Sequence, residues 1–199
     1  MAIQILKTKL YLPPELARAV PRPRLLARLD EGLRPGCKLI LNSAPAGFGK
    51  TTLVSTWIHS RGGAIPPAGE GGMTADGTSA PLRFAWLSLD RDDNDPVRFL
   101  AYLAAALQSA DVELGHEMLA AIQSPQPPVA EVVLTALLND LAEYTAPIVL
   151  VLDDYHEITA QPVHDALVFL LDHLPPHAHL LLAIHTTPTP QHLSGHKLL

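Results

Sequence analysis

The stretch Ser43-Ala44-Pro45-Ala46-Gly47-Phe48-Gly49-Lys50-Thr51-Thr52 separates two segments of different pattern. Residues 38–42 before it form a short apolar run that predicts a β-strand, and the residues from Thr51 onward have the spacing of an α-helix. A strand, a glycine-rich turn and Gly-Lys-Thr at a helix start are the parts of a loop that wraps phosphate groups, the Walker A motif. The stretch therefore predicts an α/β fold built around a phosphate-binding loop.

The residue types of this loop suit a nucleoside triphosphate. Gly47 and Gly49 allow backbone angles that turn successive N–H groups toward phosphate oxygens, and the positive end of the following helix faces the same anion. We expect Lys50 to reach the β- and γ-phosphates and the Thr51 hydroxyl to ligate Mg²⁺. The predicted nucleotide contacts of the loop are Ala46, Gly47, Phe48, Gly49, Lys50, Thr51 and Thr52.

Ala44 stands where the usual pattern has its first glycine. The loop tolerates alanine there if φ is negative at that position. A glycine-rich turn that contains a lysine by chance is the alternative, and a strand before it, a helix after it and an acidic strand end downstream argue against that alternative.

That acidic strand end is the second decisive feature. Residues 147–152 are continuously apolar, which is typical of a strand buried on both faces of a parallel sheet, and Asp153-Asp154 follow directly. Ligands of open α/β sheets lie at the carboxyl ends of strands. We expect Asp153 to hold Mg²⁺ through water, as a Walker B motif does, and Asp154 to orient or deprotonate an attacking water. An Asp-Asp turn without function is the alternative.

The remaining chain alternates between strand and helix patterns, which predicts a three-layer P-loop NTPase fold with a mostly parallel central sheet flanked by helices and incomplete at its C-terminus. Further strands are expected at residues 84–89 and 179–183, and helices at residues 24–32, 97–108, 113–123, 129–144 and 161–174. Asp95 is a suitable N-cap and Pro96 a suitable first helical residue.

The pattern divides the chain into three parts. Residues 1–21 are expected to form an extended N-terminal arm, residues 22–188 the ATPase core, and residues 189–199 a divergent tail. Within the core, residues 62–82 are rich in glycine, proline and small side chains, which predicts a flexible surface insertion.

Composition excludes several classes of protein. A chain of 199 residues with 48% hydrophobic and 17% charged residues is globular, and its net charge of −6 without a basic block gives little support for nucleic-acid binding by this segment. Cys37, the only cysteine, cannot form an internal disulfide, which fits a reducing cytoplasm. The first ten residues are no signal peptide, and no apolar run approaches the roughly 20 residues that span a bilayer.

Two further clusters resemble metal sites but fit them poorly. The loop with Asp90, Asp92 and Asp93 lacks the twelve-residue spacing and terminal Glu of a calcium loop, so a solvated loop before a helix is preferred. The histidines of residues 173–179 are separated by prolines that prevent a zinc-binding helical face, so surface or strand-edge positions are preferred.

Taken together, these motifs resemble a known family, the MalT-like, LuxR-type transcriptional regulators, within the NACHT/STAND-type signal-transduction ATPases. The similarity is carried by residues 8–10 and 20–26 at the start, by the loop of residues 43–52, by residues 85–90 with the following helix, and by residues 150–156. It extends over nearly all of the chain except residues 62–82 and the last dozen residues.

The resemblance implies a regulatory switch in the N-terminal ATPase domain of such a regulator. ATP binding would favour an active, self-associating state, and slow Mg²⁺-dependent hydrolysis would reset it to ADP. It implies nucleotide and metal roles for Lys50, Thr51 and Asp153, and it places Arg22 and Arg24 in a segment that closes over the base. DNA would be bound only through modules that this chain lacks.

The departures from the family bear on hydrolysis and stability. His185 aligns with an arginine that senses the γ-phosphate in relatives, so we expect weak or lost hydrolysis. Without the fifth strand that relatives place beside the loop strand, residues 38–42 would form an exposed edge that invites self-association. A free-standing small P-loop hydrolase or kinase, and a remnant that no longer binds nucleotide, stay open as alternatives.

Overall fold

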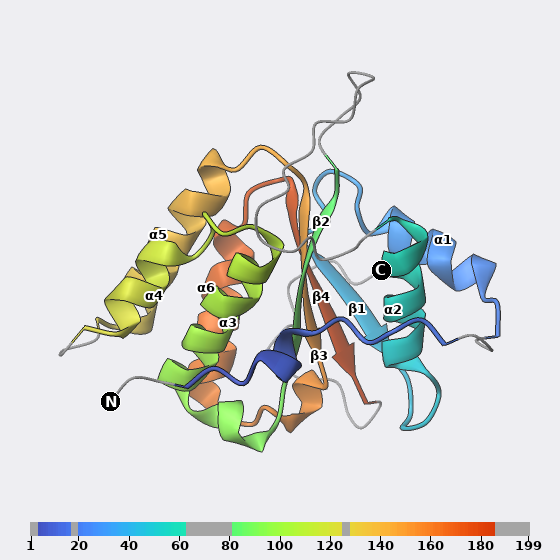
Figure 1. Ribbon diagram of the computed structural model, residues 1–199, viewed down its shortest axis with the longest axis horizontal. Helices are drawn as coiled ribbons and strands as arrows, with labels where there is room; N and C mark the ends of the chain where they lie inside the picture. Colours follow the sequence, from blue (N-terminus) through green and yellow to red (C-terminus); the bar gives the residue numbers. More distant parts are fainter. Residues whose placement is uncertain (1–3, 17–19, 63–80, 125–127, 186–199) are drawn as a thin grey trace.

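The computed structural model describes residues 4–16, 20–62, 81–124 and 128–185. Its centre is a sheet of β1 (Leu39–Ser43), β2 (Arg83–Ser88), β3 (Ile148–Asp153) and β4 (Ala178–Ile184). The strands are parallel in the order β1-β4-β3-β2 (Figure 1). The predicted strands at residues 38–42, 84–89, 147–152 and 179–183 each match one of these to within one residue at either end.

Helices cover both faces of the sheet and make the three layers (Figure 1). On one side lie α1 (Pro23–Glu31) and α2 (Lys50–Ser60). On the other lie α3 (Pro96–Ala110), α4 (His116–Ile122), α5 (Ala130–Glu143) and α6 (Gln161–His173). Asp95 accepts a hydrogen bond from the backbone N–H of Arg98 and Pro96 opens α3, which confirms the predicted cap.

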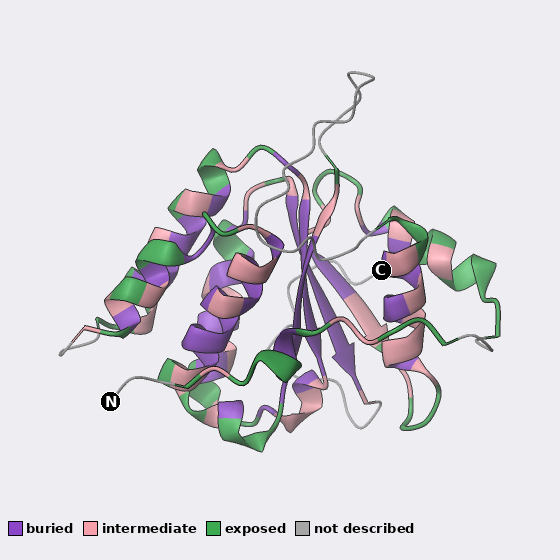
Figure 2. Ribbon diagram, viewed as in Figure 1, coloured by how far each residue is buried: buried purple, intermediate pink, exposed green. Residues whose placement is uncertain are grey.

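Successive side chains of the central strands point to opposite faces of the sheet, so each face has its own hydrophobic core. Val149 and Val151 of β3 pack with Trp57 of α2, whereas Leu150 and Leu152 pack with α3, α5 and α6. All residues of β3 and β4 are buried, and Figure 2 shows the strands as a buried layer between half-exposed helices. In the register of the sheet, Ser43 pairs with Ile184 and Ser88 pairs with Asp153. The carboxyl ends of all four strands therefore lie at the same edge of the sheet, where the candidate site is located.

The described part of the N-terminal arm lies against the edge strand β2. Its 3-10 turn Lys7–Leu10 buries Lys9 and Leu10, and the Lys9 ammonium forms an ion pair with Asp93. The expectation of a solvated acidic loop at residues 90–95 is wrong for Asp93, whose side chain is fully buried. Asp93 also accepts a hydrogen bond from the Asp90 N–H and closes a 3-10 turn, Arg91–Asn94.

Other differences from the sequence-based expectations are smaller. The helix expected at residues 113–123 begins at His116, because Gly115 adopts a left-handed φ of 69° and donates its N–H to Asp140. Residues 63–80 of the expected insertion and the tail at 189–199 lie outside the described residues. Within the described part of the chain, no helix is long and apolar enough to cross a membrane.

Candidate nucleotide-binding site

The loop between β1 and α2 has the backbone that its glycines predict. Gly47 and Gly49 adopt φ of 79° and 74°. A Cβ at Gly47 would meet nothing within 4 Å, so the left-handed φ, and not lack of space, requires glycine there. Asp154 is the one non-glycine with positive φ among the described residues, so Ala44 has the negative φ under which alanine replaces the first glycine.

Lys50 is folded back over this loop. Its side chain is buried, and Nζ donates to the carbonyl oxygens of Ala44 at 3.0 Å and Pro45 at 3.2 Å. Asn42 fixes the start of α2 by donating from Nδ2 to the Lys50 carbonyl at 3.2 Å. No carboxylate lies within ion-pair distance of the Lys50 ammonium among the residues that the structure describes, so its charge is available to an anion in the loop.

Thr51 and Asp153 bring the two motifs into contact. The Thr51 hydroxyl donates to Asp153 Oδ2 at 2.8 Å, and the Asp154 N–H donates to Asp153 Oδ1 at 3.1 Å. Burial raises the pKa of Asp153, and the hydrogen bond from Thr51 opposes that rise. A hydroxyl and a carboxylate that meet beside the loop offer the oxygen ligands that Mg²⁺ takes.

Asp154 occupies a different position from its neighbour. It adopts a left-handed φ of 56°, and its carboxylate lies 3.9 Å from Nδ1 of His156. The His156 ring stacks on the ring of His185 with centroids 3.7 Å apart. His185, which the sequence placed at the sensor position, therefore lies with Asp154 at the ends of β3 and β4.

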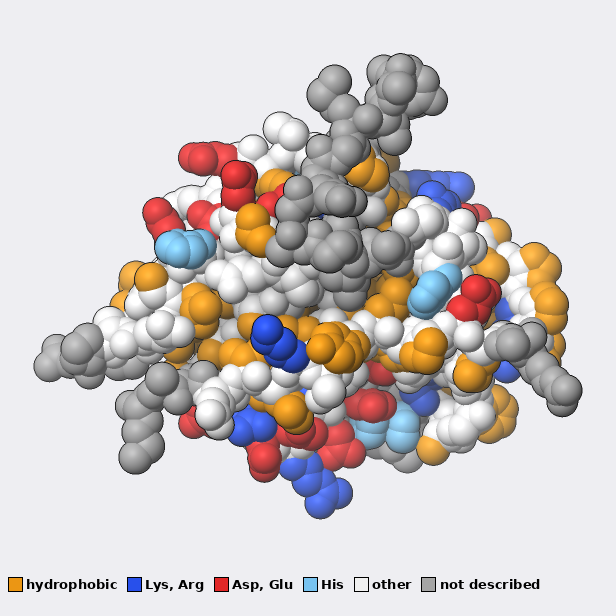
Figure 3. Space-filling model, in the orientation of Figure 1, with side chains coloured by type: hydrophobic (Ala, Val, Ile, Leu, Met, Phe, Trp, Pro, Cys, Tyr) orange, Lys and Arg blue, Asp and Glu red, His pale blue; other side chains and the backbone are white. Residues whose placement is uncertain are grey.

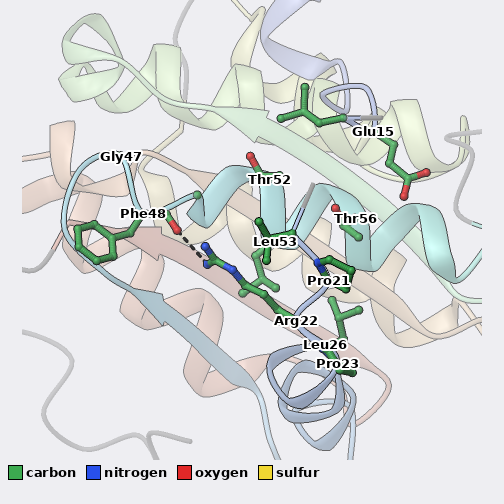
Figure 4. Close-up of a pocket in the computed structure, with 13 residues that line it drawn as sticks. Glu15, Pro21, Arg22, Pro23, Leu26, Gly47, Phe48, Thr52, Leu53 and Thr56 are labelled. Atoms are coloured by element: carbon green, nitrogen blue, oxygen red, sulfur yellow. Dashed lines mark hydrogen bonds between the residues drawn. The ribbon is translucent and has the colours of Figure 1, made fainter. Parts of the chain in front are cut away.

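A cavity of about 640 Å³ opens beside the loop (Figure 4). Arg22 lies in its wall and donates from Nη1 to the Phe48 carbonyl at 2.9 Å. Arg24 is exposed and does not line the cavity, so the structure does not bring it to the loop. The lining residues are Glu15, Leu16, Val20, Pro21, Arg22, Pro23, Leu26, Gly47, Phe48, Gly49, Thr52, Leu53 and Thr56.

The site predicted from the sequence did not include the apolar residues of this cavity wall. Leu26 of α1 and Leu53 of α2 face the cavity, but in sequence they cannot be told from core residues. The one available signal was helical spacing, because Thr56 lies one turn beyond the predicted contact Thr52 and thus on the same face of α2.

The histidines of residues 173–179 do not gather into a site. The ring nitrogens of His173, His177 and His179 each lie 2.7–2.9 Å from a backbone carbonyl oxygen, that of Phe169, Leu141 and Cys37 respectively. Among the described residues, the one group of side chains that could hold a metal ion lies elsewhere, at Asp154, His156 and His185.

Comparison with curated proteins confirms the resemblance to MalT-like regulators. The chain is 35% identical over 186 residues to the HTH-type transcriptional regulator MalT of Cronobacter sakazakii, and 35% identical over 184 residues to MalT of Serratia proteamaculans. Each alignment covers 92% of this chain and 18% of the relative, so the chain spans less than a fifth of the length of these proteins. No family model matches the chain.

Comparison with solved structures supports the fold. The crystal structure of Cdc6p from Pyrobaculum aerophilum matches with a TM-score of 0.50 and 16% identity, covering 94% of this chain and 43% of that one. At this identity the likeness concerns the fold alone. With the parallel sheet and its flanking helices, it confirms the P-loop NTPase fold predicted from the sequence.

Proposed function

We propose that this chain is the nucleotide-binding switch domain of a MalT-like transcriptional regulator, holding ATP or ADP together with Mg²⁺. The observation that carries the proposal is the contact between Thr51 and Asp153 directly beside the loop that holds Lys50. The residues of both motifs lie together at one edge of the sheet, in a fold whose relatives by sequence regulate transcription.

This geometry offers a contact for each part of the nucleotide. The phosphates would lie against the backbone N–H groups of residues 46–52, and Lys50 would exchange its two carbonyl acceptors for phosphate oxygens. Mg²⁺ would take the Thr51 hydroxyl and, through water, Asp153. The base would enter the cavity beside Arg22, whose wall combines apolar side chains with this one guanidinium.

Slow hydrolysis belongs to the same proposal. Asp154 is the carboxylate that would orient or deprotonate water, but it lies beside His156 and His185, and the structure gives it no hydrogen bond to Lys50 or Thr51 among the described residues. His185, whose side chain is shorter than that of arginine, stands where relatives would supply an arginine to the γ-phosphate. We therefore expect a protein that stays in its nucleotide-bound state far longer than a metabolic enzyme does.

A free-standing hydrolase or kinase is the second candidate. Such an enzyme needs a second pocket for a phosphoacceptor or arginines that close on the transferred phosphate. Arg22 is the one arginine that lines the described cavity. This favours a binding switch over rapid group transfer.

The test is Mg-ATP binding by the 199-residue chain and by Lys50→Ala, measured calorimetrically. We expect micromolar affinity that falls at least about tenfold in the variant, because a charge-assisted hydrogen bond contributes roughly 1.5–3 kcal/mol. Lys38→Ala is the control, since Lys38 is bonded to the Asp172 carbonyl outside the loop. Turnover well below roughly 1–100 s⁻¹ separates the switch from a kinase. Absence of any binding by the unaltered chain would instead identify a remnant.

A further inference from the structure

Outside the Thr51–Asp153 contact, the ends of β3 and β4 carry a second group of ligand-type side chains. One ligand atom from each of Asp154, His156 and His185 lies within 4.8 Å of the other two. Figure 3 shows histidine side chains directly beside acidic ones at the lower edge of the molecule, where the strands of Figure 1 end. We propose that Asp154, His156 and His185 bind a divalent transition-metal ion of the zinc type, separate from Mg²⁺ and without need of nucleotide.

His156 is already arranged as a metal ligand. Its Nδ1 is buried without a hydrogen-bond partner and lies 3.9 Å from Asp154 Oδ1. A buried polar nitrogen without a partner is costly, and a metal ion would satisfy it.

The other ring nitrogen of His156 has the second contact that metal-bound histidines require. Nε2 lies 3.4 Å from Glu157 Oε1, and Arg91 holds the other Glu157 oxygen at 3.1 Å. A carboxylate on one nitrogen places the proton there and leaves the lone pair on the other. The proton of His156 is therefore expected on Nε2, with the Nδ1 lone pair directed toward Asp154.

The spacing of Asp154 and His156 fits a metal ion better than a hydrogen bond. Tetrahedral zinc with bonds of about 2.1 Å to nitrogen and oxygen sets the two ligand atoms roughly 3.4 Å apart. The separation of 3.9 Å between Nδ1 and Oδ1 is too long for a hydrogen bond and only about half an ångström from this value. A small side-chain rotation would close it.

His185, directly after the end of β4, would supply the third ligand. Its ring lies almost parallel to that of His156, with an interplanar angle of 15° and centroids 3.7 Å apart. Stacking keeps the second imidazole beside the first, and one ring must tilt for nitrogens of both rings to face the same ion. Asp153 is not needed, because its two oxygens accept hydrogen bonds from Thr51 and from the Asp154 N–H.

The donor set selects the class of ion. Two imidazoles and one carboxylate suit Zn²⁺ and its neighbours in the first transition row, whereas Mg²⁺ and Ca²⁺ take oxygen ligands. Three protein ligands leave a fourth tetrahedral position for water or an anion.

The experiment measures Zn²⁺ binding by the nucleotide-free chain in competition with a chromogenic chelator. We expect one ion per chain, with affinity reduced about tenfold or more in His156→Gln and in His185→Gln, and by about tenfold in Glu157→Gln through loss of the partner of His156. Co²⁺ provides a second readout, since its visible absorption changes with the ligands that surround it. Circular dichroism checks that each variant is folded.

Two variants serve as controls. His173→Gln removes a histidine at the end of α6, and Asp153→Asn removes the carboxylate assigned to Mg²⁺; both should bind Zn²⁺ as the unaltered chain does. The proposal is overturned if folded His156→Gln and His185→Gln keep full affinity, or if Asp153→Asn alone loses it. Neither outcome bears on Mg-ATP binding, which Lys50→Ala tests independently.

Discussion

The Thr51 hydroxyl donates a 2.8 Å hydrogen bond to Asp153, and this contact joins two residues that are 102 positions apart in the chain. It connects the first turn of α2 to the carboxyl end of β3. Asp153 is only 3% exposed, and burial raises its pKa, so holding the ionised carboxylate there disfavours the folded state. For the proposed role of Asp153 in binding Mg²⁺, function and stability therefore oppose one another.

Asp153→Asn should separate the two effects. The amide oxygen can still accept from Thr51, but Nδ2 replaces the oxygen that accepts the Asp154 N–H. Because the buried charge disappears at the cost of that one hydrogen bond, we expect the nucleotide-free variant to melt at least as high as the unaltered chain, on the scale of roughly 2–4 °C per kcal/mol. The same variant should gain little from Mg-ATP. Thermal melts with and without Mg-ATP measure both effects.

Asp154→Asn is the matched comparison, because the Asp154 side chain is 46% exposed and its charge is partly solvated. Its melting temperature without nucleotide should be almost unchanged. A lower melting temperature for Asp153→Asn, or unimpaired stabilisation of that variant by Mg-ATP, would contradict the role given to Asp153.

Local patterns predicted most of the fold and the centre of the site. The glycine loop, the lysine and threonine at a helix start, and an apolar run ending in aspartates each lie within a few consecutive residues, so their chemistry can be recognised without knowledge of distant contacts. The order of the strands, β1-β4-β3-β2, was not part of that prediction, because it depends on contacts between distant segments.

Long-range pairs were not predictable in this way. The acidic loop looked solvated because the partner of Asp93 is Lys9, 84 positions earlier. The stacking of His156 on His185 likewise depends on β3 and β4 being neighbours. Arg22 and Arg24 carry the same charge two positions apart, and only the path of the chain into α1 shows which of them faces the cavity.

The buried pair of Lys9 and Asp93 should make the N-terminal arm important for stability. Lys9→Met keeps the apolar stem but leaves the fully buried Asp93 with Arg98, whose Nε is 3.4 Å away. Removing one partner of a buried pair costs about 3–5 kcal/mol, and we expect a loss of that order in urea unfolding. Lys7→Met, at an exposed position of the same turn, should change stability by less than about 0.5 kcal/mol. Equal effects of the two changes would show that the pair is not stabilising.

Arg22 should contribute to nucleotide affinity and Arg24 should not. Arg22→Ala removes the guanidinium that bonds to the Phe48 carbonyl and lines the cavity. We expect ATP affinity to fall by about fivefold to tenfold, which corresponds to roughly 1–1.4 kcal/mol. Arg24→Ala has the same charge change at an exposed position, so calorimetry should give an unchanged affinity. If Arg22→Ala and Arg24→Ala bind ATP with equal affinity, the nucleotide base does not bind in the cavity beside Arg22.

His179 should make the protein less stable in mild acid. Burial lowers the pKa of His179 below the ordinary value of 6.5, although its hydrogen bond to the Cys37 carbonyl acts in the opposite direction. Because the unfolded chain then binds a proton more readily, stability falls as the pH drops below about 6.5, by at most roughly 1.4 kcal/mol per pH unit. His179→Gln should flatten this slope between pH 7.5 and 5.5 in urea unfolding, and His173→Gln should preserve it. A slope that persists in His179→Gln would assign the acid sensitivity to other groups.

The edge strand β1 should promote self-association. Within the described residues β1 pairs only with β4, and its free side borders a cavity of about 420 Å³ that Leu25, Ile40 and Leu41 help to line. An edge strand with unpaired backbone groups next to apolar side chains is a template for a strand of another molecule. A lysine on such an edge strand opposes this pairing. We expect sedimentation to show association that grows with concentration in the tens of micromolar and weakens in Leu41→Lys. Val132→Lys, an equivalent change at an exposed position of α5, should associate like the unaltered chain. A monomer at all these concentrations, or equal association of both folded variants, would place the interface away from β1.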